Sequence, residues 1–148
     1  MSNQTTWTDD AGGIFNANAT TPLPVSANPV PAGATAVGAS QTGAATPLSG
    51  TLAAGGAAKR TYISGLVVTG AGATAGSVIT VTLTNTVGGT MNFKVVVPAG
   101  AGTSITPLVV NFIPPVPAGA LNQGIAVTVP SFGAGNTDAA FSAWGYNV

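Results

Sequence analysis

Residues 79–97 read ITVTLTNTVGGTMNFKVVV, two alternating runs joined by a turn. Apolar residues occupy every second position in both runs, which is the period of a half-buried strand. The pattern predicts an antiparallel hairpin with a loop from Asn85 to Gly89. One face is expected to pair Ile79 with Val95, Val81 with Phe93, and Leu83 with Met91. The other is expected to pair Thr80 with Lys94, Thr82 with Asn92, and Thr84 with Thr90. Because a slip of one residue would exchange the two faces, the register is strongly specified.

Further short apolar runs lie on both sides of this hairpin. From residue 46 onward, strands are expected at 46–54, 61–69, 77–84, 90–97, 106–113, 124–129 and 138–148, with Gly- and Pro-rich turns between them. Pro114, Pro115 and Pro117 are expected to end the run at 106–113, because proline cannot donate to a sheet ladder. Strands at this spacing, without a helical period, predict an all-β antiparallel sandwich or barrel.

Residues 1–45 differ in character from the rest of the chain. They are rich in Ala, Thr, Gly and Pro and show no sustained period. We therefore divide the chain into an extended N-terminal arm, 1–45, and a β-sandwich domain, 46–148. Such a segment is either a loose linker or an arm that lies along a neighbouring subunit. Scattered apolar residues favour the arm, because a linker has no need of them: Trp7, Ile14, Phe15, Leu23, Val25 and Val30.

The ionisable side chains are few, which limits the chemistry open to the chain. Charged residues make up 4% of the 148, against about 25% in an ordinary soluble domain, and the formal net charge is zero. Cys and His are absent, which removes thiolate chemistry, zinc–thiolate sites and the commonest general base. Asp9 and Asp10 are neighbours in the arm, whereas paired catalytic carboxylates must face a shared substrate on a rigid frame. We expect neither an enzyme nor a bound cofactor or metal.

Nucleic-acid and membrane partners are not expected either. Lys59, Arg60 and Lys94 are the basic residues, too few for the clustered positive surface that binds phosphates. No run approaches the roughly 18 apolar residues of a membrane span. The N-terminus shows no secretory signal pattern, which predicts synthesis in the cytoplasm.

Four residues of the predicted domain are candidate contacts with a partner. Lys59 and Arg60 precede a strand, where they either protect a sheet edge from aggregation or pair with an acidic partner. Trp144 and Tyr146 alternate with Phe141, Ala143 and Gly145 on the last strand. One of these two sets is expected to be core and the other a contact patch, since aromatic residues are enriched in interfaces.

Three segments together resemble small virion structural proteins of tailed bacteriophages, some of which decorate or cement the capsid. They read AKRTYISGLVVTGAGATAGSVITVTLTNTVGGTMNFKVVVPAGAG, PLVVNFIPPVPAG and VTVPSFGAGNTDAAFSAWGY, within residues 58–148. The resemblance implies a β-sandwich or jelly-roll domain fixed to the outside of an icosahedral head. It implies the major capsid protein as partner, a homo-oligomer on the capsid surface, and a final location in the virion. It brings no active-site residues.

Two functions from different classes remain open. The first is a structural protein that cements the head lattice. The alternative is a tail or fibre component that binds a host surface glycan or receptor, since jelly rolls serve both purposes. A cellular adhesin or surface-layer protein is a weaker third, because the secretory signal is missing. Aromatic residues stacked on an exposed rim would favour a glycan, and aromatic residues covered by a flat neighbour would favour cement.

Overall fold

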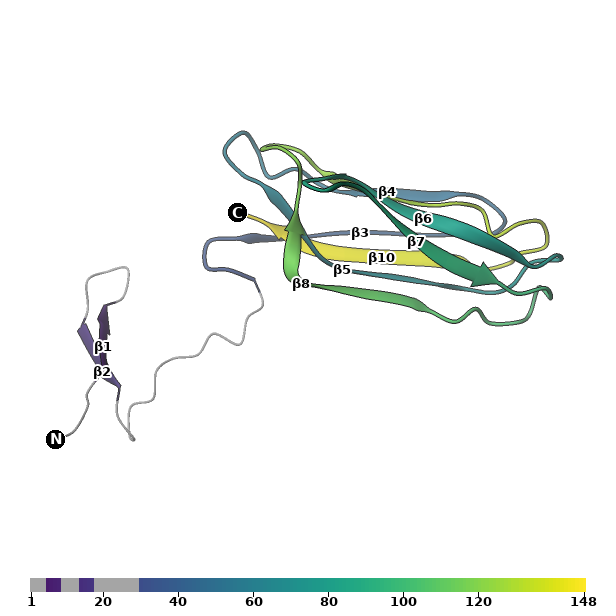
Figure 1. Cartoon of the computed structure of the whole chain (residues 1–148), viewed down its shortest axis with the longest axis horizontal. Coiled ribbons are helices and arrows are strands. Elements are labelled where there is room, and N and C mark those ends of the chain that lie inside the picture. Colours follow the sequence, from purple (N-terminus) through teal and green to yellow (C-terminus); the bar gives the residue numbers. More distant parts are fainter. Residues whose placement is uncertain (1–4, 9–13, 18–29) are drawn as a thin grey trace.

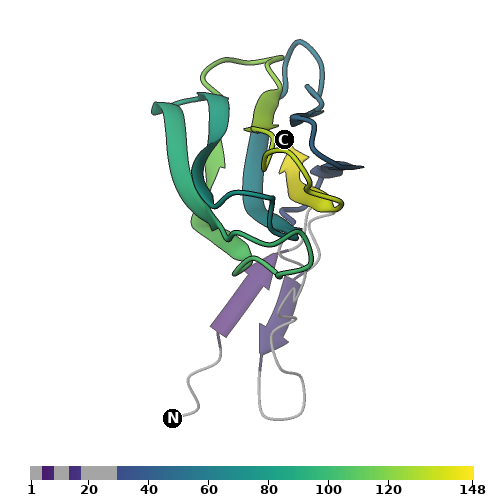
Figure 2. The same cartoon turned by 90° about the vertical axis from the view of Figure 1, so that its right-hand side faces the viewer.

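The structure is a computed structural model that describes residues 5–8, 14–17 and 30–148. Within these ranges all regular structure is β-strand. Residues 30–148 contain two four-stranded antiparallel sheets packed face to face (Figures 1 and 2). The predicted all-β antiparallel sandwich is confirmed. An additional two-stranded sheet is formed by β1 (Thr5–Thr8) and β2 (Ile14–Ala17), within the predicted arm.

The order of the strands is that of a jelly roll. One sheet has the order β3 (Thr35–Gly43), β10 (Ala139–Asn147), β5 (Thr61–Gly70), β8 (Leu108–Pro117). The other has the order β4 (Leu48–Leu52), β9 (Ile125–Val129), β6 (Ser77–Thr86), β7 (Gly89–Val97). The first of these eight strands pairs with the last, the second with the seventh, the third with the sixth and the fourth with the fifth. Residues 35–147 thus form one long hairpin rolled into two layers.

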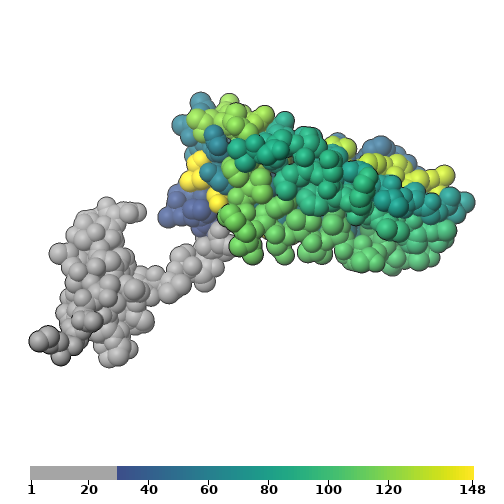
Figure 3. Space-filling model, in the orientation of Figure 1, coloured from purple at the N-terminus to yellow at the C-terminus, as the bar shows by residue number. Residues whose placement is uncertain are grey.

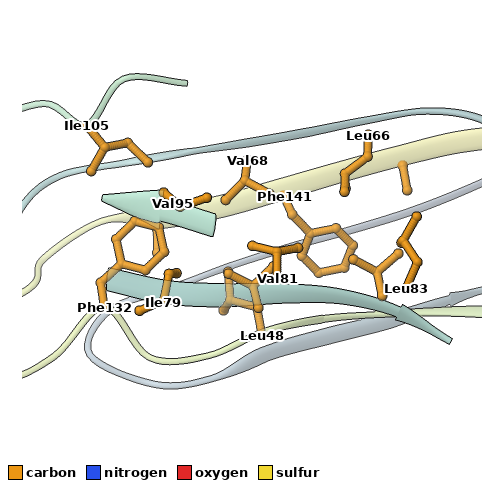
Figure 4. Packing of buried hydrophobic residues seen from close by; sticks show 14 of the residues in the cluster. Leu48, Leu66, Val68, Ile79, Val81, Leu83, Val95, Ile105, Phe132 and Phe141 are labelled. Carbon is orange, nitrogen blue, oxygen red and sulfur yellow. The ribbon is translucent and has the colours of Figure 1, made fainter. Parts of the chain in front are cut away.

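The core lies between the two sheets and is built by the period-two alternation of the strands. Figure 4 shows Leu66, Val68 and Phe141 of one sheet facing side chains of the other, among them Leu48, Val81 and Leu83. Phe141 reaches across the core, since a Cβ on Gly50 of β4 would lie 2.8 Å from its Cζ. Phe132, from the loop before β10, fills one end of the core.

The predicted register of the β6–β7 hairpin is confirmed over most of its length. The cross-strand pairs are Ile79–Val95, Val81–Phe93, Leu83–Met91, Thr80–Lys94 and Thr82–Asn92. Beyond Leu83 the prediction is wrong, because the register shifts and Thr86 lies opposite Gly89. Asn85 adopts a left-handed φ of 67°, and the Thr86 hydroxyl donates to the Gly89 carbonyl at 2.6 Å. This irregularity shortens the loop to Val87 and Gly88, and the predicted pairing of Thr84 with Thr90 across the hairpin is not formed.

Strand β8 continues through the prolines that were expected to end it. Its register with β5 jumps from Gly65–Asn111 to Ile63–Val116, so the residues between form a large bulge. Figure 1 shows the sharp bend that results, and Ile113 at this bend is 92% exposed. Proline is tolerated here because β8 is the outermost strand of its sheet and pairs with a single neighbour, β5.

The predicted boundary at residues 45 and 46 falls inside the sandwich. Residues 35–43, assigned to the arm from composition, form the edge strand β3 against β10. Only small apolar side chains such as Val37 and Ala39 face the core from this strand, so its sequence lacks a strong alternating pattern. The segment that precedes the sandwich is therefore shorter than predicted.

Candidate functional site

The outer face of the β3-β10-β5-β8 sheet is uncharged and has an aromatic residue at its centre. Two rows of cross-strand partners define this surface, which we call the Trp144 face: Ser40–Ser142–Val67–Val109 and Gly38–Trp144–Gly65–Asn111. Trp144 is 40% exposed and Val109 is 58% exposed. Aromatic side chains on such a surface supply a large contact area for a partner.

The two glycines beside Trp144 are not equivalent. A Cβ added to Gly65 would lie 2.3 Å from Trp144 Cζ2 and 2.6 Å from Cε2. A Cβ added to Gly38 would meet only the Ala143 carbonyl oxygen, at an ordinary 3.5 Å. The indole therefore lies over the backbone of β5 and not over β3. The missing side chain of Gly65 lets the aromatic ring settle against the sheet while part of it stays open to a partner.

Tyr146 shares the face of Trp144 but is much less accessible. Its ring stacks on Tyr62 of β5, with centroids 5.1 Å apart and an interplanar angle of 14°. Only 7% of Tyr146 is exposed. Burial raises the pKa of the Tyr146 phenol, and the neighbouring Tyr62 hydroxyl raises it further. The alternation predicted one core set and one contact set on β10. Phe141 and Ala143 are the core set, and of the other pair Trp144 is the residue that a partner can reach.

The outer face of the opposite sheet is a surface of hydroxyl groups, which we call the threonine face. Cross-strand partners Ser49, Thr128, Thr82 and Asn92 form one row, and Thr51, Ala126 and Thr84 form the next. Lys94 is the charged residue of this surface, and its Nζ donates to Thr80 Oγ1 at 2.5 Å. Hydroxyl groups are cheaper to dehydrate than ions, so this surface accepts a close neighbour at modest cost.

Lys59 and Arg60 lie in the loop before β5, at one end of the sandwich. The Arg60 N–H donates to the Val148 carbonyl at 2.7 Å and the Val148 N–H returns a bond of 3.1 Å. The Lys59 carbonyl accepts from the Asn122 N–H at 2.8 Å. Since β5 lies between β10 and β8, these charges do not protect an open sheet edge. Contact of Lys59 and Arg60 with an acidic partner stays a prediction.

The predicted anchors of the arm are only partly covered by the structure. Trp7 of β1 lies opposite Phe15 of β2, and Ile14 lies opposite Thr8. Val30 is half-buried where the described part of the sandwich begins. Leu23 and Val25 lie outside the described residues.

Sequence reasoning missed two features of the surface. A groove of about 250 Å³ lies where β7 ends and β8 begins, lined by Lys94, Val95, Val96, Thr106, Pro107 and Leu108. Next to it, Val78 and Val96 are cross-strand partners that are 60% and 67% exposed. The predicted hairpin register, extended toward the strand ends, would have found this valine pair. The groove needed the tertiary structure, because β7 and β8 belong to different sheets.

Comparison of the chain with protein-family models, with curated proteins and with solved structures finds no match. Among the residues that the structure describes, no group of three or more His, Cys, Asp or Glu side chains is placed to hold a metal ion. The same residues include no helix of the length and apolarity needed to cross a bilayer.

Proposed function

We propose that this chain is a structural protein of a bacteriophage virion, which binds the outside of the capsid and stabilises the head lattice. Its partner would be the major capsid protein. The observation that carries the proposal is the composition of the two broad sheet faces. The Trp144 face presents small polar and apolar groups around an exposed indole, and the threonine face presents hydroxyl groups with Lys94 as its charged residue. The jelly-roll topology supports it by analogy, because capsid proteins often use this fold.

A nearly ion-free surface suits permanent attachment to a large assembly. Burying an ion without a partner is very costly, whereas apolar groups gain from burial and hydroxyl groups cost much less than ions when they find a hydrogen-bond partner in the neighbour. Exposed Trp residues are frequent hot spots in interfaces, where one side chain can contribute about 2 kcal/mol or more. Trp144 is the residue of the sandwich best placed for this part.

The benefit to the capsid follows from linkage. A protein that binds the assembled shell, and not its dissociated subunits, shifts the equilibrium toward the shell. Because many copies bind one lattice, each contact can be modest while the assembly gains collectively.

The proposal is tested by measuring copy number and binding together. Quantitative mass spectrometry of purified particles should find the chain in proportion to the major capsid protein. The purified chain should raise the temperature at which undecorated capsids disassemble. Trp144→Ala should weaken this binding, while Leu121→Ala, which truncates another exposed side chain at 53%, should not. Absence of the chain from particles would reject the proposal.

A tail or fibre component that binds a host glycan is the second candidate. The observation in its favour is the indole laid over Gly65 with Asn111 and Ser142 in neighbouring positions, since sugar rings stack on such surfaces and bond to hydroxyl and amide groups. A few copies per particle, together with Trp144 fluorescence changes on adding host surface polysaccharide, would favour this function over capsid binding.

A further inference from the structure

The side-chain charges of the chain are divided between its two parts. Residues 1–29 contain Asp9 and Asp10 and no cation, a net charge of −2. Residues 30–148 contain three cations, Lys59, Arg60 and Lys94, against the single carboxylate of Asp138, a net charge of +2. The whole chain is neutral only because these parts cancel. These opposite charges attract residues 1–29 toward the surface of a sandwich domain and increase the rate at which the two meet.

The β7–β8 side of the sandwich provides a receiving site. In the described part of the chain, β7 pairs only with β6 and β8 pairs only with β5, so both strands have an open edge. Figure 3 shows the teal surface of β7 next to the green surface of β8 along this side. The groove between them has Leu108 and Val95 in its wall and Lys94 at its margin. Its volume, about 250 Å³, suits a few side chains of an extended peptide.

Of the two open edges, β7 is the better template for an added strand. Residues 89–97 contain no proline, so every backbone N–H of β7 is present. By contrast, β8 contains Pro114, Pro115 and Pro117 and follows Pro107, which removes donors along its length. A strand that joins a sheet edge gains main-chain hydrogen bonds, while its alternate side chains fill the pockets beside that edge.

Residues 22–25, Pro-Leu-Pro-Val, have the pattern that such an edge requires. Leu23 and Val25 are two residues apart, so in an extended strand their backbone groups point to one side and their side chains to one face. Pro22 and Pro24 alternate with them, so the missing N–H groups fall on the outer side, toward solvent. One edge of this segment can pair and the other cannot, which ends the sheet after a single added strand.

Geometry requires that the segment come from another copy. Leu108 lies opposite Val68, Val68 opposite Phe141, and Phe141 opposite Gln41. Leu108 is therefore roughly 20 Å along the sheet and roughly 14 Å across it from Thr35, where β3 begins. The described trace resumes at residue 30, at the end of the sandwich where β3 begins (Figure 1), and the five residues from Val25 to Val30 span at most about 17 Å when fully extended. Because this span is shorter than the separation, the segment of the same copy does not reach the groove.

We propose that residues 22–25 of one copy add to the β7 edge of a second copy, with Leu23 and Val25 in the groove beside Leu108. The contact joins two different surfaces, so it is heterologous and closes into a ring when the rotation between copies permits. This assignment concerns contacts between copies of the chain and does not depend on capsid binding.

Cross-linking of the purified full-length protein tests the assignment directly, because the chain has no cysteine of its own. Ser26→Cys protein is mixed with Thr106→Cys protein and treated with a short bis-maleimide. We expect a cross-linked dimer of the two variants. A mixture of Ser26→Cys with Ser49→Cys, an exposed position on β4 at the other side of the sandwich, should give much less. Equal yields from the two mixtures would overturn the assignment. A cross-link within a single chain, in protein that carries both Ser26→Cys and Thr106→Cys, would also overturn it.

Sedimentation provides a second measurement with a matched pair of variants. The unmodified protein should form a concentration-dependent oligomer. Leu23→Asp should shift it to monomer, because a carboxylate would enter the apolar groove. Ala27→Asp adds the same charge to the same segment outside residues 22–25 and should leave the oligomer in place. A monomer at all concentrations, or equal effects of both substitutions, would refute arm exchange. Since no capsid is present, failure here would leave the proposed virion function to its own test.

Discussion

The two glycines beside Trp144 allow a sharp test of how the indole is held on the sheet. Gly65→Ala would place a Cβ 2.3 Å from Cζ2 of the indole, whereas Gly38→Ala would meet nothing closer than 3.5 Å. Neither glycine has a positive φ, so alanine suits the backbone at both positions. We therefore expect Gly65→Ala to push the indole off the strand and Gly38→Ala to leave it in place.

The magnitude follows from the burial of the side chain. Trp144 is 40% exposed, so folding covers more than half of its surface. Of a Trp side chain's roughly 250 Å², about 150 Å² is then covered, which is worth at most about 4 kcal/mol at ~25 cal/mol per Å². Replacing glycine by alanine within a strand recovers about 0.5–1 kcal/mol, and the displaced ring keeps some contacts. We expect a net loss of about 1–3 kcal/mol for Gly65→Ala and a gain of up to about 1 kcal/mol for Gly38→Ala.

Urea unfolding followed by Trp fluorescence measures both effects. A Trp7→Phe background leaves Trp144 as the sole tryptophan, because the chain has two. The emission of Gly65→Ala protein should shift to longer wavelength as the ring enters water, and its unfolding midpoint should fall. The Gly38→Ala protein should keep the parent spectrum. If both variants had the same spectrum and stability, the indole would not rest on Gly65 as described.

Three further predictions concern stability. Phe141→Ala should lower the free energy of unfolding by about 3–5 kcal/mol in urea titrations, because the ring spans the core; a loss below about 1 kcal/mol would contradict that packing. Asn136→Ala should cost about 1–3 kcal/mol by the same assay, since its amide nitrogen donates to the Ala71 carbonyl at 2.7 Å and to the Asp138 carbonyl at 3.0 Å; an unchanged midpoint would show these bonds to be dispensable. The raised pKa of Tyr146 favours the neutral phenol in the folded state, so its contribution is complete below the unfolded pKa of about 10 and is lost as pH rises through the folded pKa. Tyr146→Phe should therefore lose less stability than the parent between about pH 8 and pH 11, and equal losses would count against this linkage.

Local patterns predicted much of the sandwich. The β6–β7 register was correct from Ile79–Val95 to Leu83–Met91, because alternation of apolar and hydroxyl residues fixes which face is buried. It failed at Asn85, whose left-handed conformation shortens the loop and is one of several that an Asn-containing turn can adopt. The assignment of residues 35–43 to the arm was also wrong. Small residues give β3 a weak alternating pattern, and its pairing with β10 holds it in the sheet.

The candidate contact surfaces were likewise predictable only in part. Composition alone made a charge-poor surface inevitable, and the alternation on β10 named Trp144 as one of a few possible contacts. Tyr146, two residues away, has the same local signal and is nevertheless buried against Tyr62.

The sequence by itself determined that the chain forms amphipathic strands with few ions and no thiol or imidazole, because residue type and period-two spacing are local properties. Only the tertiary structure decided that Gly65 would lie beneath Trp144, that Tyr62 would cover Tyr146, and that the edges of β7 and β8 would frame a groove. Each of these contacts joins strands that are distant in sequence, and the physical reason is the rolling of one long hairpin into two layers, which no local pattern encodes.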